Sequence, residues 1–288
     1  MVFRAASRRP VPDRYRTIWI SDLHLGTRAA KVDGLLHFLD RHEADRYYLV
    51  GDIIDGWALQ RSWYWPASHN EVLQALLERA QDADMIYIPG NHDEAARQFP
   101  GLQLGGITIQ KQAIHTTADG RRLLVLHGDE FDGVVRHARW LSKIGGWAYR
   151  SLLALNRPLN RVRRWLDKPY WSLAAAAKTT TKRAVQYIAN FEHAVVDRAR
   201  REDADGVVCG HIHVPALRPL QHVTYANTGD WVENCTALVE HRDGRLTLRR
   251  GSPTPHLNRG VVPGGPAPTG DGAPSDPASP PTPDVAPA

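Results

Sequence analysis

Short apolar runs alternate with amphipathic stretches in the N-terminal part of the chain. Residues 17–20, 47–50 and 85–88 are apolar runs of the length expected for buried strands. Between them, apolar side chains recur at helical spacing over 32–39 and again over 71–80, which predicts two amphipathic helices. Strands that alternate with helices in this way predict an α/β domain in which helices cover a central sheet.

The rest of the chain continues this pattern with one long interruption. Apolar runs at 123–126, 207–209, 224–225 and 237–239 predict further strands. From about residue 133 to 191 the sequence is rich in Leu, Ala and Trp and contains no run of strand character. We therefore predict a helical cap over 133–191, inserted between two strands of the sheet.

Composition separates the two ends of the chain from a folded domain over residues 15–250. Residues 1–14 are basic, contain two prolines and lack the apolar core of a signal peptide, so we expect a flexible N-terminus and a cytoplasmic protein. Residues 251–288 consist mainly of Pro, Gly, Ala, Ser and Thr, which bury too little apolar surface to offset the entropy of ordering, so we expect a disordered tail. No stretch reaches the roughly 20 apolar residues that a membrane-spanning helix needs.

Five short polar motifs each follow an apolar run. The residues just beyond the carboxyl ends of strands line the ligand crevice of an α/β sheet, so we expect these motifs to converge on one site. Any one of them alone is typical of a turn or a helix cap, but turns have no need of histidine in four of five places. The motifs are Asp22-Leu23-His24, Gly51-Asp52, Gly90-Asn91-His92-Asp93, His127-Gly128-Asp129 and Gly210-His211-Ile212-His213.

The residue types in these motifs predict a site for two divalent metal ions. Asp22 and His24 are two residues apart, as are His211 and His213, and residues i and i+2 of an extended chain point to the same side. Carboxylate, imidazole and amide ligands without a thiolate suit manganese, iron, zinc or cobalt rather than a structural thiolate zinc. The candidate ligands are Asp22, His24, Asp52, Asn91, His127, His211 and His213.

The order of the five motifs, over about Ile18 to Arg249, resembles the calcineurin-like metallophosphoesterase superfamily. The resemblance implies a four-layer α/β/β/α sandwich, with two sheets between layers of helices. It also implies that Asp52 bridges two ions. One ion would be held by Asp22, His24, Asp52 and His213, and the other by Asp52, Asn91, His127 and His211.

Hydrolysis at phosphorus follows from such a pair of ions. Two cations clamp the attacking and leaving oxygens of a displacement and lower the pKa of a water molecule. His92 lies next to a ligand but outside the ligand set, so we expect it to protonate the leaving oxygen or to stabilise the phosphoryl oxygens. We expect Asp93 to orient its imidazole. The plainer alternative for His92 is a polar residue at a helix N-terminus.

The net charge of +5 is concentrated in the predicted cap. Between residues 133 and 191 the only acidic residue is Asp167, against twelve Lys and Arg, with Trp and Tyr interleaved. This pattern suits an anionic bilayer surface or a phosphate-bearing amphiphile, and it would also suit the phosphates of a nucleic acid. The alternative is a solvated basic face with the tryptophans in the core. The candidate substrate-binding residues are Arg157, Arg161, Arg164, Lys178 and Lys182.

A basic helical insertion between the His-Gly-Asp and Gly-His-x-His motifs resembles the UDP-2,3-diacylglucosamine diphosphatases of lipid A biosynthesis. The resemblance implies cleavage of the pyrophosphate of a lipid-linked nucleotide sugar, giving lipid X and UMP, by a peripheral enzyme at the inner face of the cytoplasmic membrane. One position departs from that family, which has Arg where this chain has His92. An imidazole can donate a proton and a guanidinium cannot.

Two other functions stay open at this point. One is a phosphodiesterase or nuclease, or another phosphoesterase of the superfamily, whose basic cap binds a different substrate. The other is a non-catalytic scaffold, against which stands the complete set of metal ligands. The sequence points to no protein partner.

Overall fold

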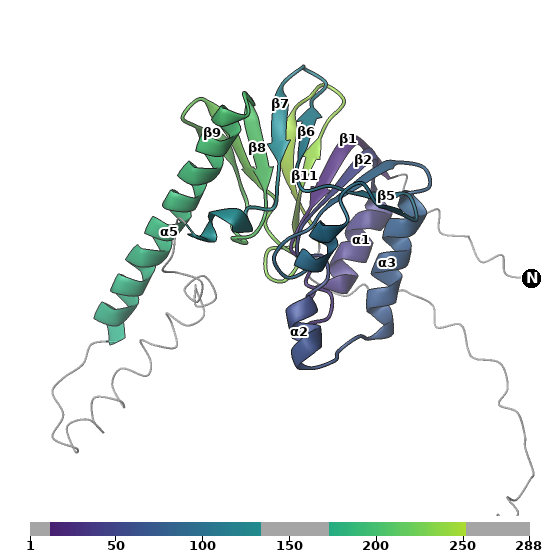
Figure 1. Ribbon diagram of the computed structural model, residues 1–288, viewed down its shortest axis with the longest axis horizontal. Coiled ribbons are helices and arrows are strands. Elements are labelled where there is room, and N and C mark those ends of the chain that lie inside the picture. The colour runs from purple at the N-terminus through teal and green to yellow at the C-terminus, as the bar shows by residue number, and fades with distance from the viewer. Residues whose placement is uncertain (1–11, 134–172, 252–288) are drawn as a thin grey trace, which may run out of the picture. The chain divides into compact units, whose positions relative to one another are not determined.

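The computed structural model describes residues 12–133 and 173–251, with the backbone alone for 173–183 (Figure 1). Within this part, the strands form two mixed sheets. The seven-stranded sheet has the order β12-β11-β1-β2-β3-β5-β4, and the five-stranded sheet the order β6-β7-β8-β10-β9. The strands are β1 Asp13–Ile20, β2 His42–Val50, β3 Asp84–Ile88, β4 Gln103–Leu104, β5 Ile107–Ile109, β6 Ala113–Thr116, β7 Arg122–Val125, β8 Gly206–Cys209, β9 Ala216–Leu220, β10 Val223–Asn227, β11 Thr236–Glu240 and β12 Leu246–Arg250.

Helices cover the outer faces of the sheets. α1 (Val32–Arg41) and α3 (Ala67–Arg79) pack on the seven-stranded sheet, and α5 (Leu173–Arg201) packs on the five-stranded sheet. The short helix α2 (Gly56–Arg61) and the 3₁₀ turns η1 (Glu94–Gln98) and η2 (Asp129–Gly133) lie in the loops. None of the described helices is both long enough and apolar enough to cross a membrane.

Alternation of side chains along the strands produces the layers. Ile18 of β1 belongs to the core that α1 and α3 cover, whereas the next residue, Trp19, belongs to a core shared with Val125 of β7 and Val208 of β8. Successive side chains of a strand point to opposite faces, so the two sheets pack against each other through one face each. The expected four-layer α/β/β/α arrangement is therefore the observed one.

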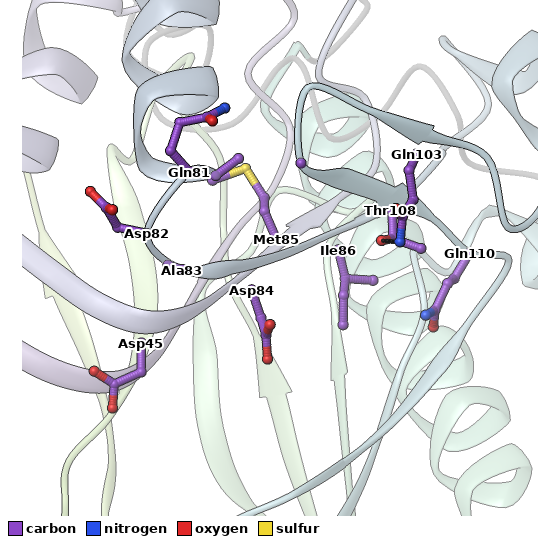
Figure 2. Close-up of a pocket in the computed structure, with 12 residues that line it drawn as sticks. Asp45, Gln81, Asp82, Ala83, Asp84, Met85, Ile86, Gln103, Thr108 and Gln110 are labelled. Carbon is purple, nitrogen blue, oxygen red and sulfur yellow. Dashed lines mark hydrogen bonds between the residues drawn. The ribbon is translucent and has the colours of Figure 1, made fainter.

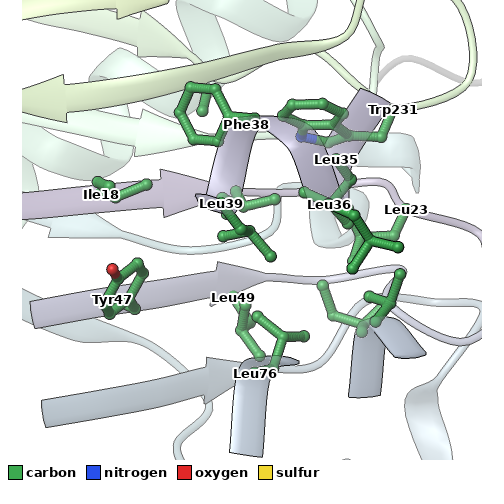
Figure 3. Close-up of a cluster of buried hydrophobic side chains, with 14 of the residues drawn as sticks. Ile18, Leu23, Leu35, Leu36, Phe38, Leu39, Tyr47, Leu49, Leu76 and Trp231 are labelled. Atoms are coloured by element: carbon green, nitrogen blue, oxygen red, sulfur yellow. The ribbon is translucent and has the colours of Figure 1, made fainter. Parts of the chain in front are cut away.

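The outer core of the seven-stranded sheet fixes the helices beside the strand ends. Leu35 and Leu39 of α1 and Leu76 of α3 are almost completely buried against Leu49 of β2 (Figure 3). Burying a leucine side chain stabilises the fold by about 1.5–3 kcal/mol. This packing holds the strand ends in place, and so each loop that follows a strand starts from a rigid position.

α5 differs from the cap that the sequence predicts. It continues to Arg201, beyond the expected limit at 191, and Phe191, Val195 and Ala199 are completely buried against the five-stranded sheet. The C-terminal part of this helix is therefore a layer of the sandwich. Most of the predicted cap, the N-terminal residues before 12 and the tail after 251 lie outside the described residues.

The strands are longer and more numerous than the apolar runs suggest. β1 begins at Asp13 and β2 at His42, several residues before the apolar runs. The apolar runs miss these first residues because they are polar and mostly exposed. The short strands β4, β5 and β6 and the edge strands β9 and β12 have few buried side chains. Their pairing depends on neighbours distant in sequence, which a local apolar pattern does not reveal.

Candidate metal centre

The seven expected ligands come together where five parallel strands end. β1, β2 and β3 run parallel in one sheet, and β7 and β8 run parallel in the other. The loops of the two sheets touch: the amide of His211 donates to Oδ2 of Asp22 at 3.1 Å, and Nε2 of His127 lies 3.5 Å from Oδ2 of Asp52. Ligands from both sheets therefore face one space.

Asp22, His24 and His213 form the first cluster of ligand atoms. Nε2 of His213 lies 3.1 Å from Oδ1 of Asp22 and 3.3 Å from Nε2 of His24. The other oxygen of Asp22 is occupied by the hydroxyl of Ser21 and the amide of His211. Oδ1 of Asp22 is therefore the oxygen left to meet a cation.

Asp52, His127 and His211 form the second cluster. Oδ1 of Asp52 accepts from the amide of His92 at 2.9 Å, so Oδ2 is the free oxygen. That oxygen lies 3.8 Å from Nε2 of His24 and 3.5 Å from Nε2 of His127. Asp52 thus lies between the two clusters, in the position that a bridging carboxylate requires.

The hydrogen bonds of the imidazoles leave the correct nitrogens free. Nδ1 of His127 lies 2.9 Å from the carbonyl oxygen of Val50, and Nδ1 of His24 lies 3.0 Å from Oδ2 of Asp55. Both acceptors fix the proton on Nδ1, so that Nε2 presents a lone pair. His211 is held through Nε2, 2.8 Å from Asp132, which leaves its Nδ1 for a ligand bond.

Three buried atoms of the candidate ligands lack a hydrogen bond within the described residues. Asp22 Oδ1, Asn91 Oδ1 and His127 Nε2 are buried and make no hydrogen bond within the described residues. An unsatisfied buried polar atom costs about 1–3 kcal/mol, and coordination of a divalent cation would satisfy all three. The donor set of carboxylate, imidazole and amide therefore fits two such ions.

Negative charge dominates the electrostatics of the cluster. Burial lowers the pKa of His127, but the carboxylates of Asp52 and Asp22 outweigh it and raise this pKa to about 10. For Asp22, burial raises the pKa, and the nearby His213 and His127 more than reverse this effect. Such a field favours positive charge, and a metal ion competes with the proton for the same nitrogens.

The ligand backbone is strained in a way that the sequence did not indicate. Asp22, His24, Asp52, His211 and His213 all have positive φ values, between 49° and 70°. The expectation that Asp22 and His24 share a side of an extended chain is therefore wrong, because left-handed turns direct these side chains instead. This conformation costs non-glycine residues roughly 1–2 kcal/mol each, and such strain concentrates at functional sites.

Two glycines are required by space rather than by backbone angle. A Cβ atom on Gly90 would overlap Asp52 Oδ1 and lie 2.7 Å from His127 Nε2, and one on Gly210 would overlap Asp22 Oδ2. Real Cβ atoms essentially never approach a neighbour so closely. Only glycine lets these loops pass directly behind the ligands.

His92 lies at the rim of the ligand clusters. Its Nε2 is 4.0 Å from Oδ2 of Asp52, and its Nδ1 is 2.8 Å from Oδ1 of Asp55. The latter contact has ion-pair distance, although the ring N–H is not aligned with the oxygen. The indole of Trp57 lies over the imidazole, with ring centroids 4.3 Å apart.

The structure corrects the partner expected for His92. The carboxylate of Asp93 accepts from the amides of Gly90 and Ile53, at 2.5 and 2.7 Å, and so holds the loop rather than the imidazole. Asp55 takes the orienting position instead. Burial lowers the pKa of His92, but Asp55 and Asp52 outweigh it and raise this pKa, which favours an imidazolium that can donate a proton.

Asp55 and Asp132 contact imidazoles of the candidate site, although the sequence did not single them out. Asp55 follows Asp52 by three residues on the same loop, and Asp132 follows the His-Gly-Asp motif. The closeness of these two carboxylates to the ligand motifs in the sequence is the signal that could have identified them. The loop after β10 also braces the site, since the amide of Trp231 donates to the Asp22 carbonyl and the side chain of Asn234 to the His213 carbonyl.

The expected cap contacts fall largely outside the described residues. Arg157, Arg161 and Arg164 are not among the described residues. Lys178 and Lys182 belong to the part of α5 for which only the backbone is described. A hollow of about 590 Å³ is lined by Asp45 and Asp84 at the starts of β2 and β3 (Figure 2). It opens at the opposite ends of the strands from the metal ligands and takes no part in the site.

Comparison with known proteins agrees with this geometry. UDP-2,3-diacylglucosamine hydrolase from Photorhabdus laumondii is 28% identical over 214 residues, covering 69% of this chain and 82% of its own. The enzyme of the same name from Klebsiella pneumoniae is 25% identical over 219 residues, covering 71% and 85%.

Solved structures give weaker matches. An archaeal phosphodiesterase aligns with a TM-score of 0.39 and 11% identity over 81% of this chain and 98% of its own. A phosphoesterase from E. coli aligns with a TM-score of 0.39 and 15% identity over 82% and 99%.

A family model described as calcineurin-like phosphoesterase matches residues 15–215. This span covers more than half of the chain and contains all five motifs. The chain belongs to the calcineurin-like phosphoesterase family and is a metal-dependent hydrolase of phosphoester bonds.

Proposed function

We propose that this protein hydrolyses the pyrophosphate of UDP-2,3-diacylglucosamine to give lipid X and UMP. Two kinds of observation support the proposal. The ligand clusters around Asp52 suit displacement at phosphorus. Relatives named UDP-2,3-diacylglucosamine hydrolase align with about 70% of the chain. The observation that carries the reaction class is the position of Asp52 between the two clusters.

The roles of the side chains follow from their contacts. We assign one ion to Asp22, His24, Asp52 and His213, and the other to Asp52, Asn91, His127 and His211. When bound, the two ions clamp the attacking and leaving oxygens and lower the pKa of a water molecule. Manganese is the proposed metal, with iron, zinc and cobalt as alternatives that the same donor set accepts.

His92 is the proposed general acid. Its Nε2 faces the ligand cluster at Asp52, and Asp55 and Asp52 raise its pKa. A protonated imidazole there can give its proton to the leaving oxygen or hydrogen-bond a phosphoryl oxygen. Asp55 holds the far nitrogen of the ring, and Asp93 acts indirectly by holding the loop that carries His92.

We further propose that the basic segment over 133–191 contacts the anionic inner face of the cytoplasmic membrane. Twelve Lys and Arg against one Asp, interleaved with aromatic residues, suit such a surface. Arg157, Arg161, Arg164, Lys178 and Lys182 are the candidates for substrate contacts. Replacing these five with glutamine should weaken flotation of the protein with anionic liposomes.

A phosphodiesterase acting on nucleic acid is the alternative, and one residue favours it. His92 replaces the Arg that the lipid A enzymes have at this point of the motif, which supplies a proton donor that those enzymes lack there. A leaving group different from that of the lipid A enzymes would require such a proton donor. The basic segment would then bind the phosphates of the polymer.

A substrate panel separates these functions. Manganese-loaded protein is offered UDP-2,3-diacylglucosamine, a short oligonucleotide and a bis-aryl phosphodiester, with the His92→Ala variant in parallel. Release of UMP from the lipid alone supports the proposal, and cleavage of the oligonucleotide alone supports the alternative. Equal turnover by wild type and His92→Ala on every substrate would remove the acid role from His92.

A further inference from the structure

A second polar pocket, of about 330 Å³, lies beside the loop that follows His24. The first turns of α1 and α3 both line it, together with Arg28, Tyr64 and His69. None of these residues is a candidate metal ligand. The pocket is therefore built from groups other than those of the metal centre.

Both helices present free amide groups at this pocket. α1 has ten residues and α3 has thirteen, and neither has a side chain that caps its N-terminus. In the described part of the chain, the amides of Val32, Asp33 and Gly34 and those of Ala67 and Ser68 have no hydrogen-bond acceptor. Free amides and the helix dipole make such N-termini attract anions.

A buried histidine provides an independent donor. His69 is only 2% exposed and lines the pocket. Its Nδ1 accepts from the amide of Gly26 at 3.1 Å, which places the ring proton on Nε2. No described residue accepts a hydrogen bond from Nε2, and this nitrogen is not completely buried. The small exposed part of the ring therefore offers an N–H to the pocket.

The charged side chains favour the same class of ligand. The guanidinium of Arg28 lies 4.5 Å from the ring centroid of Tyr64, and this stacking holds it at the pocket while its N–H groups stay available. Arg28 and Lys31 make no ion pair within the described residues. Asp33 is the one acidic residue in the lining, and its side chain is exposed.

We propose that this pocket binds a phosphate group at a site separate from the metal centre. Two cations, an imidazole N–H and the free amides of two helix N-termini meet there, which is the donor set that a tetrahedral anion requires. The phosphate would belong either to free inorganic phosphate or to a phospholipid headgroup. The proposal does not rest on the proposed function.

The pocket is also connected to the metal ligands. Gly26 donates to His69, and the next residue, Thr27, donates from its amide to the carbonyl oxygen of His24 at 3.1 Å. A ligand in the pocket would thus order the loop that carries His24. Phosphate bound in the pocket would therefore act on the loop next to the candidate metal ligand His24.

Nuclear magnetic resonance tests the site directly. Inorganic phosphate is titrated into zinc-loaded, full-length protein while backbone amide shifts are followed. We expect saturable shifts at Val32, Asp33, Ala67 and Ser68, and at least a tenfold weaker apparent Kd in Arg28→Gln/Lys31→Gln. Arg41→Gln, at the other end of α1, should match wild type. Absent or non-saturating shifts, or equal affinity in the double variant, would overturn the proposal.

Two further measurements refine the result. His69→Asn keeps an acceptor near the Gly26 amide but has no donor at the position of Nε2, so it should weaken phosphate binding while the far-ultraviolet circular dichroism spectrum stays that of the folded protein. Phosphatidylcholine vesicles with and without phosphatidic acid distinguish the two sources. Loss of phosphatidic-acid-dependent flotation in Arg28→Gln/Lys31→Gln assigns the site to a headgroup, and unchanged flotation assigns it to free phosphate. An affinity for phosphate in His69→Asn equal to that of wild type would contradict the assigned donor.

Discussion

Oδ1 of Asp55 lies 2.8 Å from Nδ1 of His92, while Oδ2 of the same carboxylate lies 3.0 Å from Nδ1 of His24. One side chain thus orients both the proposed acid and a proposed metal ligand. It accounts for the raised pKa of His92 together with Asp52, against the opposing effect of burial. Outer partners of this kind are worth 10–100-fold in metal affinity or activity.

Asp55→Asn should lower kcat about 10–100-fold, because a neutral amide neither stabilises an imidazolium nor fixes the ring. The alkaline limb of the kcat profile, where the proposed acid loses its proton, should also change. His92 loses a group that raises its pKa, so the variant should lose the protonated form of His92, and with it activity, at a lower pH than wild type. Steady-state kinetics at saturating metal across pH 5–9 measure both effects.

Asp82→Asn is the matched control, since Asp82 is exposed and precedes β3, whereas the Gly-Asn-His-Asp motif follows the other end of that strand. It should behave as wild type. A profile for Asp55→Asn that is lower but keeps the wild-type pH dependence would show that Asp55 acts on the fold and not on His92.

Gly90→Ala should remove at least one of the two proposed metal ions without unfolding the protein. The added methyl group would overlap Asp52 and press on His127, two of the three residues of the second cluster. Gly133→Ala is the control, because a Cβ there meets nothing within 4 Å. Metal content by plasma mass spectrometry, with far-ultraviolet circular dichroism for the fold, should show loss of at least one ion in Gly90→Ala alone.

Removal of metal should destabilise the protein. Three buried ligand atoms make no hydrogen bond within the described residues, and each costs about 1–3 kcal/mol when unsatisfied. We expect EDTA to lower the melting temperature and abolish turnover, and added manganese to restore both. Calorimetry with and without EDTA measures the effect, and an unchanged melting temperature would mean that the clusters hold no structural ion.

Glu240 should make the fold sensitive to acid. Burial raises its pKa, but His115, the Ala118 amide, Thr17 and Arg16 outweigh this and lower the pKa from 4.5 to about 2. A lowered carboxyl pKa stabilises the folded state above pH 4.5, and this stabilisation is lost as the pH falls through about 2. At about 1.4 kcal/mol per pH unit, the loss is about 3 kcal/mol.

Urea unfolding between pH 7 and pH 2 measures this dependence. Glu240→Gln should be less stable at pH 7 and should show a shallower fall below pH 4.5. Glu43→Gln, at an exposed position of β2, should retain the wild-type slope. A Glu240→Gln variant with the full wild-type slope would assign acid sensitivity to other carboxylates.

The meeting of the candidate metal ligands at one place could be predicted because each of them follows an apolar run that forms a strand. The run before Asp52 fixes β2, and parallel pairing of β1, β2 and β3 brings the following loops to one edge. The layers were equally predictable, since alternation along a strand decides which face each side chain occupies.

The finer geometry could not be predicted, because it depends on contacts between distant segments. Asp93 adjoins His92 in sequence, yet its carboxylate turns to the amides of Gly90 and Ile53, while Asp55 reaches His92 across the site. Asp and His adopt positive φ values more often than most residue types, but too rarely for the residue type alone to predict the values at the ligands. The packing surface of α5 from Tyr187 to Ala199 depends equally on the five-stranded sheet.

Anomalous diffraction from crystals grown with manganese tests the central claim most directly. We expect two anomalous peaks per chain, one on each side of Oδ2 of Asp52. One peak should contact Asp22, His24 and His213, and the other Asn91, His127 and His211. A single peak, or two peaks that Asp52 does not join, would contradict the two-metal site.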